Sequence, residues 1–148
     1  MAEADPARQL RLLQALCGAL AGSVVAYGVV LSVAEAEVAL PEAFRPVLDV
    51  LVLLGLSLLP VSYAIKSAVA RRLQQIEAPS EKLIANAYFF ATLLAFAVRE
   101  GAALVAFLVA FVAGSHTWYF IVAGLTLVTM ASDWPTAQRY SHWGGRPS

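Results

Sequence analysis

The chain has 148 residues, of which 60% are hydrophobic and 14% are charged, and its mean hydropathy is +0.73. One small soluble core cannot hide that much apolar surface, so the composition predicts an integral membrane protein. Ten Lys and Arg residues balance ten Asp and Glu residues. Because the net charge is zero, no basic field attracts nucleic acid, and we expect no nucleic-acid partner.

Four apolar runs approach or exceed the roughly 20 residues that a helix needs to cross a bilayer. They cover residues 12–33, 47–68, 83–113 and 117–134. Unpaired backbone groups are so unfavourable in lipid that these runs are predicted as helices rather than open strands. The sequence therefore predicts one all-α membrane domain over residues 1–148, a bundle of four transmembrane helices.

The first run resembles a signal peptide because Arg8 and Arg11 precede it, but it is too long for the apolar part of one. Leu16 stands before Cys17, where a lipoprotein signal has a small residue. We therefore expect this run to be retained as a transmembrane helix. Cys17 has no second cysteine in the chain, so neither an intrachain disulfide nor a cysteine zinc site is expected.

The third and fourth runs differ in length. The third is longer than a bilayer requires, so its helix should tilt or project into the cytoplasm, and Ser80 is its expected N-cap. The fourth is short, and Trp118 and Trp134 mark its two ends as interfacial aromatic belts. Asp133 and Pro135 end its apolar run, although a bent helix can resume after a proline.

The cations predict the orientation through the positive-inside rule. Those near the two termini and the middle connection are Arg8, Arg11, Lys66, Arg71, Arg72, Lys82, Arg139 and Arg146. Arg45 is the only cation on the other side, in an acidic loop over residues 34–46. Both termini are therefore expected in the cytoplasm. The use of two Lys against eight Arg suggests a high-GC bacterium, so we expect a multi-pass protein of the inner (plasma) membrane.

Arg99 and Glu100 are the ionisable pair deep in a predicted span. A charged side chain at the bilayer centre costs about 2.5 to 3.5 kcal/mol, so both should face protein or water. Adjacent helical residues point about 100° apart, which predicts different partners for the two. One interpretation is that Glu100 binds a proton or ion, while Arg99 either tunes the pKa of Glu100 or pairs with Asp49 or with a group on another subunit. The other is that both residues only fix the packing of the helices. Pro60 should kink the second helix and free a carbonyl, and either this carbonyl pairs with Arg99 or the kink only shapes the packing.

Small residues recur at helical spacing on the first and third predicted helices. The third carries Ala87, Ala91, Ala95, Ala102, Ala106, Ala110 and Gly114, and the first carries Gly18, Gly22 and Ala26 with Ala15, Ala19 and Ser23 beside them. Such stripes let helix backbones approach closely in lipid. We expect packing seams, which serve either the bundle alone or also a homo-oligomer or a complex with other membrane subunits.

Motifs for catalysis or cofactor binding are not visible in the sequence. His116 and His142 lie outside the predicted spans, which argues against axial haem ligation within the bundle. The chain shows no nucleophile triad, Gly-rich phosphate loop or paired catalytic carboxylates. We therefore expect no enzyme activity, no cofactor and no metal.

The hairpin of the second and third helices resembles subunit c, the proteolipid of rotary ATP synthases, over about residues 61–114. The resemblance rests on the polar connection Ala70-Arg71-Arg72-Leu73-Gln74-Gln75 and on a carboxylate, Glu100, in the Ala-rich stretch 94–110. It implies that Glu100 corresponds to the carboxylate that binds H⁺ or Na⁺ in that family. Arg99 departs from the family's pattern, because a cation beside Glu100 should oppose proton loading.

Three functional hypotheses follow from these features. The first is a small non-catalytic membrane subunit or scaffold that assembles through its seams into a homo-oligomer or a larger complex. The second is a proton- or ion-translocating protein that uses Glu100. The third is a small transporter or a lipid- or quinone-binding protein, suggested by the break that Pro60 introduces near the midplane. Membrane lipids are expected partners in each case.

Overall fold

A computed structural model describes residues 6–33, 42–114 and 116–143, and these residues form an all-helical bundle. The elements are α1 (Pro6–Val33), the 3₁₀ turn η1 (Glu42–Phe44), α2 (Arg45–Gln74), α3 (Glu81–Ala113), α4 (Thr117–Ser132) and α5 (Ala137–His142). The four predicted helices are confirmed, and α2 continues beyond the predicted end of its span. Most of the predicted acidic loop, including Glu35 and Glu37, and Arg146 lie outside the described residues.

Three of the helices, α1, α2 and α3, are long and apolar enough to cross a membrane, and α4 is shorter with 16 residues. Large apolar side chains remain on the outside of the bundle. On α2, for example, Val50, Leu53 and Leu54 are 63%, 64% and 58% exposed. An outer surface of this kind suits an apolar solvent, as the composition predicts.

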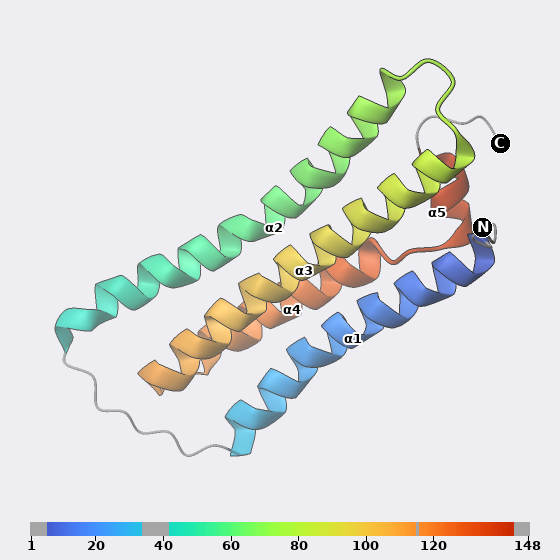
Figure 1. Cartoon of the computed structure of the whole chain (residues 1–148). Helices are drawn as coiled ribbons and strands as arrows, with labels where there is room; N and C mark the ends of the chain where they lie inside the picture. The colour runs from blue at the N-terminus through green and yellow to red at the C-terminus, as the bar shows by residue number, and fades with distance from the viewer. Residues whose placement is uncertain (1–5, 34–41, 115, 144–148) are drawn as a thin grey trace.

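The third helix is the centre of the bundle. It packs against α1, α2 and α4, while α1 and α2 lie on opposite sides of it (Figure 1). The start of α1, the connection between α2 and α3, and α5 lie together at one end, which we call the α5 end. The turn between α3 and α4 lies at the opposite end, and each long helix runs antiparallel to the next one along the chain.

Local signals fix the helix ends. Ser80 is the N-cap of α3 as predicted, because its Oγ accepts a hydrogen bond of 3.3 Å from the backbone N–H of Leu83. Gly114 ends α3 with a φ of 63°, a left-handed conformation that glycine adopts without strain. Pro60 lies inside α2 without ending it. After Pro135 the chain turns into α5, which the sequence analysis allowed but did not place.

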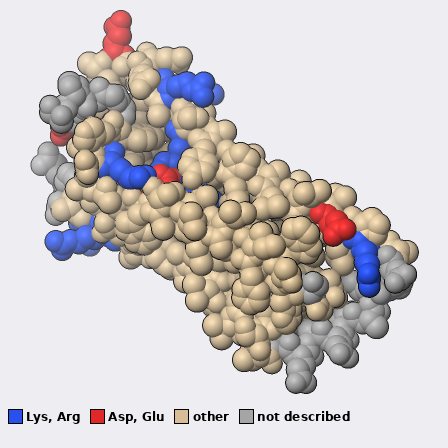
Figure 2. Space-filling view, turned by 180° about the vertical axis from the view of Figure 1, so that it is seen from behind, with Lys and Arg blue, Asp and Glu red and all other residues tan. Residues whose placement is uncertain are grey.

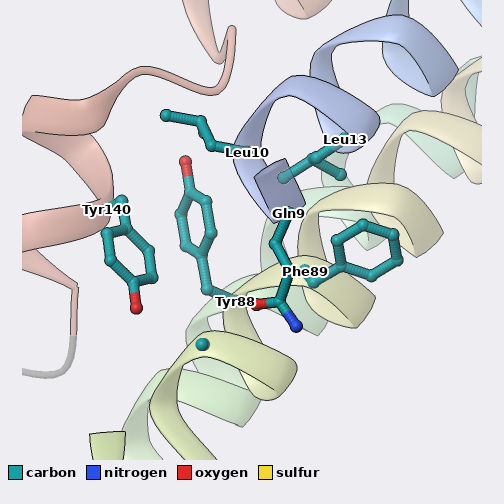
Figure 3. Close-up of a pocket in the computed structure, with 7 residues that line it drawn as sticks. Gln9, Leu10, Leu13, Tyr88, Phe89 and Tyr140 are labelled. Carbon is teal, nitrogen blue, oxygen red and sulfur yellow. The ribbon is translucent and has the colours of Figure 1, made fainter. Parts of the chain in front are cut away.

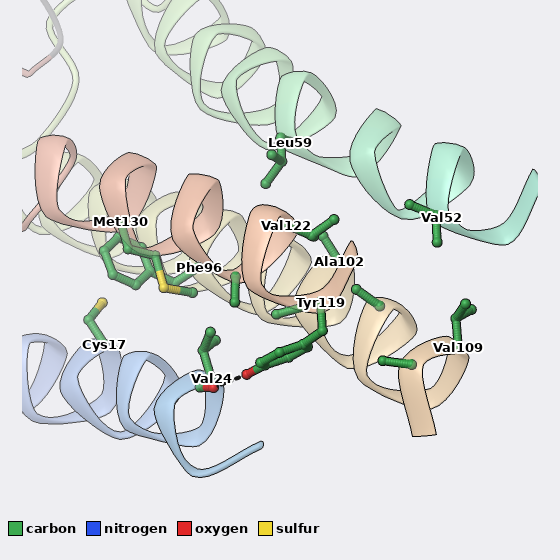
Figure 4. Packing of buried hydrophobic residues seen from close by; sticks show 14 of the residues in the cluster. Cys17, Val24, Val52, Leu59, Phe96, Ala102, Val109, Tyr119, Val122 and Met130 are labelled. Atoms are coloured by element: carbon green, nitrogen blue, oxygen red, sulfur yellow. Dashed lines mark hydrogen bonds between the residues drawn. The ribbon is translucent and has the colours of Figure 1, made fainter. Parts of the chain in front are cut away.

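The alanine stripe of α3 forms the predicted seam within the bundle. Its members Ala95, Ala102, Ala106 and Ala110 are each at most 1% exposed. A Cβ on Gly55 of α2 would lie 3.3 Å from the carbonyl oxygen of Ala102, so the backbones of α2 and α3 approach closely there. In Figure 4, Val52 and Leu59 of α2 lie on the same flank of the core.

Most of the small-residue stripe of α1 faces away from the bundle. Buried positions of α1 are Leu13, Cys17, Val24 and Leu31, each at most 1% exposed. Gly18 is partly buried and a Cβ on it would lie 3.7 Å from Trp134, but Gly22 and Ala26 are exposed and a Cβ on Gly22 would touch nothing within 4 Å. The prediction that Gly22 and Ala26 pack against another helix within the described chain is therefore wrong. The inner face of α1 is instead formed by the larger buried side chains, although other large residues of α1, such as Val25 and Val29, are exposed as well.

Candidate functional site

Two polar centres lie next to each other along α3. Arg99 faces α2 and the end of α4, whereas Glu100 faces α1. This confirms that the two adjacent residues have different partners. The rotation of about 100° between neighbours on a helix separates them, so they do not neutralise each other directly.

Arg99 is fully buried and every one of its nitrogens has a partner. Its Nε donates to Ser62 Oγ over 2.9 Å, and its Nη1 donates to the Thr129 carbonyl oxygen over 3.2 Å. Its Nη2 donates to Asp133 Oδ2 over 3.0 Å. The guanidinium also lies 4.5 Å from the centre of the Tyr63 ring. These contacts compensate for the hydrogen bonds to water that a cation loses when it is buried.

Asp133 is the carboxylate that holds this centre together. Besides Arg99, it pairs through Oδ1 with Lys66 Nζ at 2.7 Å and with Arg139 Nη1 at 3.1 Å. A carboxylate at the C-terminal end of a helix, here α4, is disfavoured by the helix dipole. Three cations from three different helices offset that effect, and they leave the cluster with a net positive charge. We call these four residues the Asp133 cluster.

Asp49 was one of the alternative partners considered for Arg99, and this alternative is wrong. Asp49 is exposed near the start of α2, whereas the α2 residue that bonds Arg99 is Ser62. At 1.5 Å per residue the two positions are about 20 Å apart along the helix. An aspartate so distant cannot reach the guanidinium, and Asp133 takes that place.

A cavity of about 400 Å³ opens beside the Asp133 cluster, at the α5 end. Its lining comprises Tyr63, Lys66, Ser67, Ala70, Tyr88, Asp133, Arg139, His142 and Trp143. Figure 2 shows basic and acidic side chains together in a hollow at one end of the molecule. Arg139 is the most accessible charged member of the cluster, with a side chain that is 49% exposed, against 14% for Lys66 and 11% for Asp133.

A second pocket at the same end is only a packing defect. It lies between Leu10 and Leu13 of α1, Tyr88 and Phe89 of α3, and Tyr140 of α5 (Figure 3). Its volume of about 10 Å³ is about that of one water, and none of its lining residues is charged. The rings of Tyr88 and Tyr140 meet edge to face, with centres 5.5 Å apart. The residues around this pocket therefore hold α5 against the bundle, and the pocket is too small for a ligand.

The Glu100 centre is simpler and lies on the opposite flank of α3. Tyr27 donates its hydroxyl hydrogen to Glu100 Oε1, and Ser23 Oγ lies 3.2 Å from the same oxygen. Glu100 remains partly exposed and forms no ion pair with any described Lys or Arg. A carboxyl group bonded by hydroxyls in this way can hold a proton or accept further hydrogen bonds.

Sequence reasoning missed three of the four members of the Asp133 cluster. Asp133 was assigned only to the end of the fourth helix, and Lys66 and Arg139 only to the orientation rule. One signal was available, because a buried arginine needs an acidic partner at a similar depth. Asp133 directly follows an apolar run and was the natural candidate for that partner.

Comparisons with known proteins add no family to this geometry. No family model, curated protein or solved structure matches the chain. The resemblance to subunit c therefore stays a prediction that rests on Glu100 and its alanine-rich helix.

Proposed function

We propose that this protein is a non-catalytic, multi-pass membrane subunit that assembles with further copies of itself through the outer face of α1. The observation that carries the proposal is the exposure of four small residues on that face, which are Ala15, Ala19, Gly22 and Ala26. We call them the outer α1 face. No described part of the chain covers it.

Lipid gives helices no hydrophobic reason to associate, so close backbone approach is the main source of affinity between them. The outer α1 face offers such an approach, because its side chains are no larger than a methyl group. Two copies present the same surface to each other, which suits a two-fold symmetric contact. Self-association therefore needs no second kind of chain.

Glu100 supports the same interface. Ser23 and Tyr27, which hold its carboxyl, directly follow Gly22 and Ala26 along α1. A partly exposed carboxyl in the middle of a span is unfavourable in lipid. A second copy packed against α1 would remove this group from lipid and could supply further donors to it.

The membrane and its orientation are part of the proposal. Lys66, Arg71, Arg72 and Arg139 gather toward the α5 end of the bundle, where both described chain ends also lie. By the positive-inside rule this end faces the cytoplasm. The composition favours a bacterial inner membrane.

The direct test is the oligomeric state of Gly22→Leu in detergent and in lipid nanodiscs, measured by native mass spectrometry. We expect wild type to be a dimer or larger, and Gly22→Leu to raise the dissociation constant about tenfold or more, equivalent to about 1.4 kcal/mol. Gly124→Leu on α4 is the matched control, since a Cβ there also touches nothing within 4 Å. A monomeric wild type, or equal effects of both variants, would rule out this interface.

Proton flux in proteoliposomes separates assembly from ion translocation, the second hypothesis for Glu100. Glu100→Gln keeps the size of the side chain and removes its charge. Assembly as the only role predicts no flux in wild type or variant and a weaker oligomer in Glu100→Gln. Flux that disappears in Glu100→Gln while the oligomer stays intact would instead identify Glu100 as an ion-binding residue.

A further inference from the structure

The cavity at the α5 end has an uneven balance of charge. Its lining includes the cations Lys66 and Arg139 together with His142, against the carboxylate of Asp133 alone. Behind it, Arg99 adds a further positive charge to the same carboxylate over 3.0 Å. The cavity wall therefore carries a net positive charge even when His142 is neutral, which favours an anion.

The hydrogen-bonding capacity of the cluster is also uneven. Lys66 and Arg139 share one oxygen of Asp133, and Arg99 takes the other. Arg99 is fully buried and does not line the cavity, so it contributes charge but no donor to a ligand there. An ammonium and a guanidinium carry more N–H donors than one carboxylate oxygen accepts. Lys66 and Arg139 therefore have donors left for a second anion in the cavity.

The remaining lining identifies the kind of anion. The lining includes the aromatic rings of Tyr63, Tyr88 and Trp143. Tyr63 is 44% exposed and also reaches the outer surface of α2. Pro60 and Leu56, three and seven residues before Tyr63 and so on the same side of α2, continue that surface toward the middle of the span. A ligand with a charged head and an apolar tail fits both parts, and the end of a transmembrane bundle is the depth at which headgroups lie.

We propose that the cavity lined by Lys66, Arg139, Tyr63 and Trp143 binds the phosphate of an anionic phospholipid, whose acyl chains lie along α2. Lys66 and Arg139 donate to the phosphate oxygens, in addition to their bonds to Asp133. Asp133 positions both cations, so it acts on the ligand through them. This site lies on a different flank of the bundle from the outer α1 face and does not depend on self-association.

The test measures lipid binding by the full chain in a neutral detergent, using native mass spectrometry with phosphatidylglycerol and, separately, phosphatidylcholine. We expect phosphatidylglycerol to bind more tightly, and Arg139→Gln to weaken its binding about tenfold. Arg72→Gln is the matched control, because this substitution removes the same charge. Arg72 is exposed near the C-terminal end of α2 and does not line the cavity. It should change the affinity less than about twofold.

Two further measurements keep the outcome clear. If Arg139→Gln fails to fold, Lys66→Gln repeats the test from α2, with circular dichroism as the check on folding. Inorganic phosphate is titrated against the bound lipid. Displacement only at high concentration supports a lipid site, whereas phosphate that binds as tightly as the lipid overturns the lipid assignment. Equal losses in Arg139→Gln and Arg72→Gln would overturn the site itself, because they would show general attraction to anionic lipid.

Discussion

Replacement of Asp133 by asparagine is expected to lower the free energy of unfolding by about 3 to 5 kcal/mol. Asparagine keeps the shape of the side chain, but Arg99 then remains fully buried without an anionic partner. Lys66 and Arg139 reach solvent more easily, so most of the effect comes from Arg99. The measurement is unfolding in mixed micelles with increasing sodium dodecyl sulfate.

Asp49→Asn is the matched control, because Asp49 is exposed and lies outside the cluster. It should change the free energy of unfolding by less than about 0.5 kcal/mol. The double variant Arg99→Met with Asp133→Asn should recover part of the loss, since no buried charge is then left unpaired. A loss below about 1 kcal/mol in Asp133→Asn, or no recovery in the double variant, would contradict the role given to this ion pair.

Gly55→Leu is expected to separate α2 from α3 and to lower the free energy of unfolding by about 1 to 3 kcal/mol. Even a Cβ at this position would lie 3.3 Å from the Ala102 carbonyl oxygen and 3.4 Å from Val105 Cγ1. Ser62 lies on the same buried face of α2, so a displaced helix also weakens its hydrogen bond to Arg99. The same detergent titration measures the change.

Gly101→Leu provides the comparison on the opposite helix. Gly101 lies on α3, and a Cβ there would touch nothing within 4 Å. Leucine also has a better helix propensity than glycine, by somewhat less than about 1 kcal/mol. Gly101→Leu should therefore be neutral or stabilising. Equal destabilisation by Gly55→Leu and Gly101→Leu would show that the close approach of α2 and α3 is not the cause.

The helices could be predicted from the sequence because the apolar runs are long and their ends carry local signals. Ser80 as the N-cap of α3 needed only its position before Glu81 and the apolar run. The extension of α2 to Gln74 and the separate helix α5 were not predicted. Both lie in polar segments, where hydropathy carries no information and packing at the α5 end decides the conformation.

The candidate site was only half predictable. That Arg99 and Glu100 have different partners follows from helix geometry alone, and the structure confirms it. The acidic partner of Arg99 is Asp133 rather than Asp49. This choice depends on how the helices are offset along the bundle axis and on where α4 ends. A single sequence does not fix those offsets between helices.

The two small-residue stripes look alike in the sequence, yet they differ in the structure. The stripe of α3 is buried because this helix has neighbours on three sides. Most of the stripe of α1 is exposed, and larger residues such as Leu13 and Val24 occupy the inner face. Spacing alone predicts that a stripe permits close approach, but it does not say which helix approaches.

The most direct test of assembly through the outer α1 face is disulfide cross-linking in native membranes. The single cysteine, Cys17, is fully buried, so it is first replaced by alanine, and Gly22→Cys or Gly124→Cys then introduces one exposed thiol. Assembly through the outer α1 face predicts that mild oxidation yields a covalent dimer for Gly22→Cys and leaves Gly124→Cys monomeric. A monomer in both variants, or equal dimer yields, would contradict it.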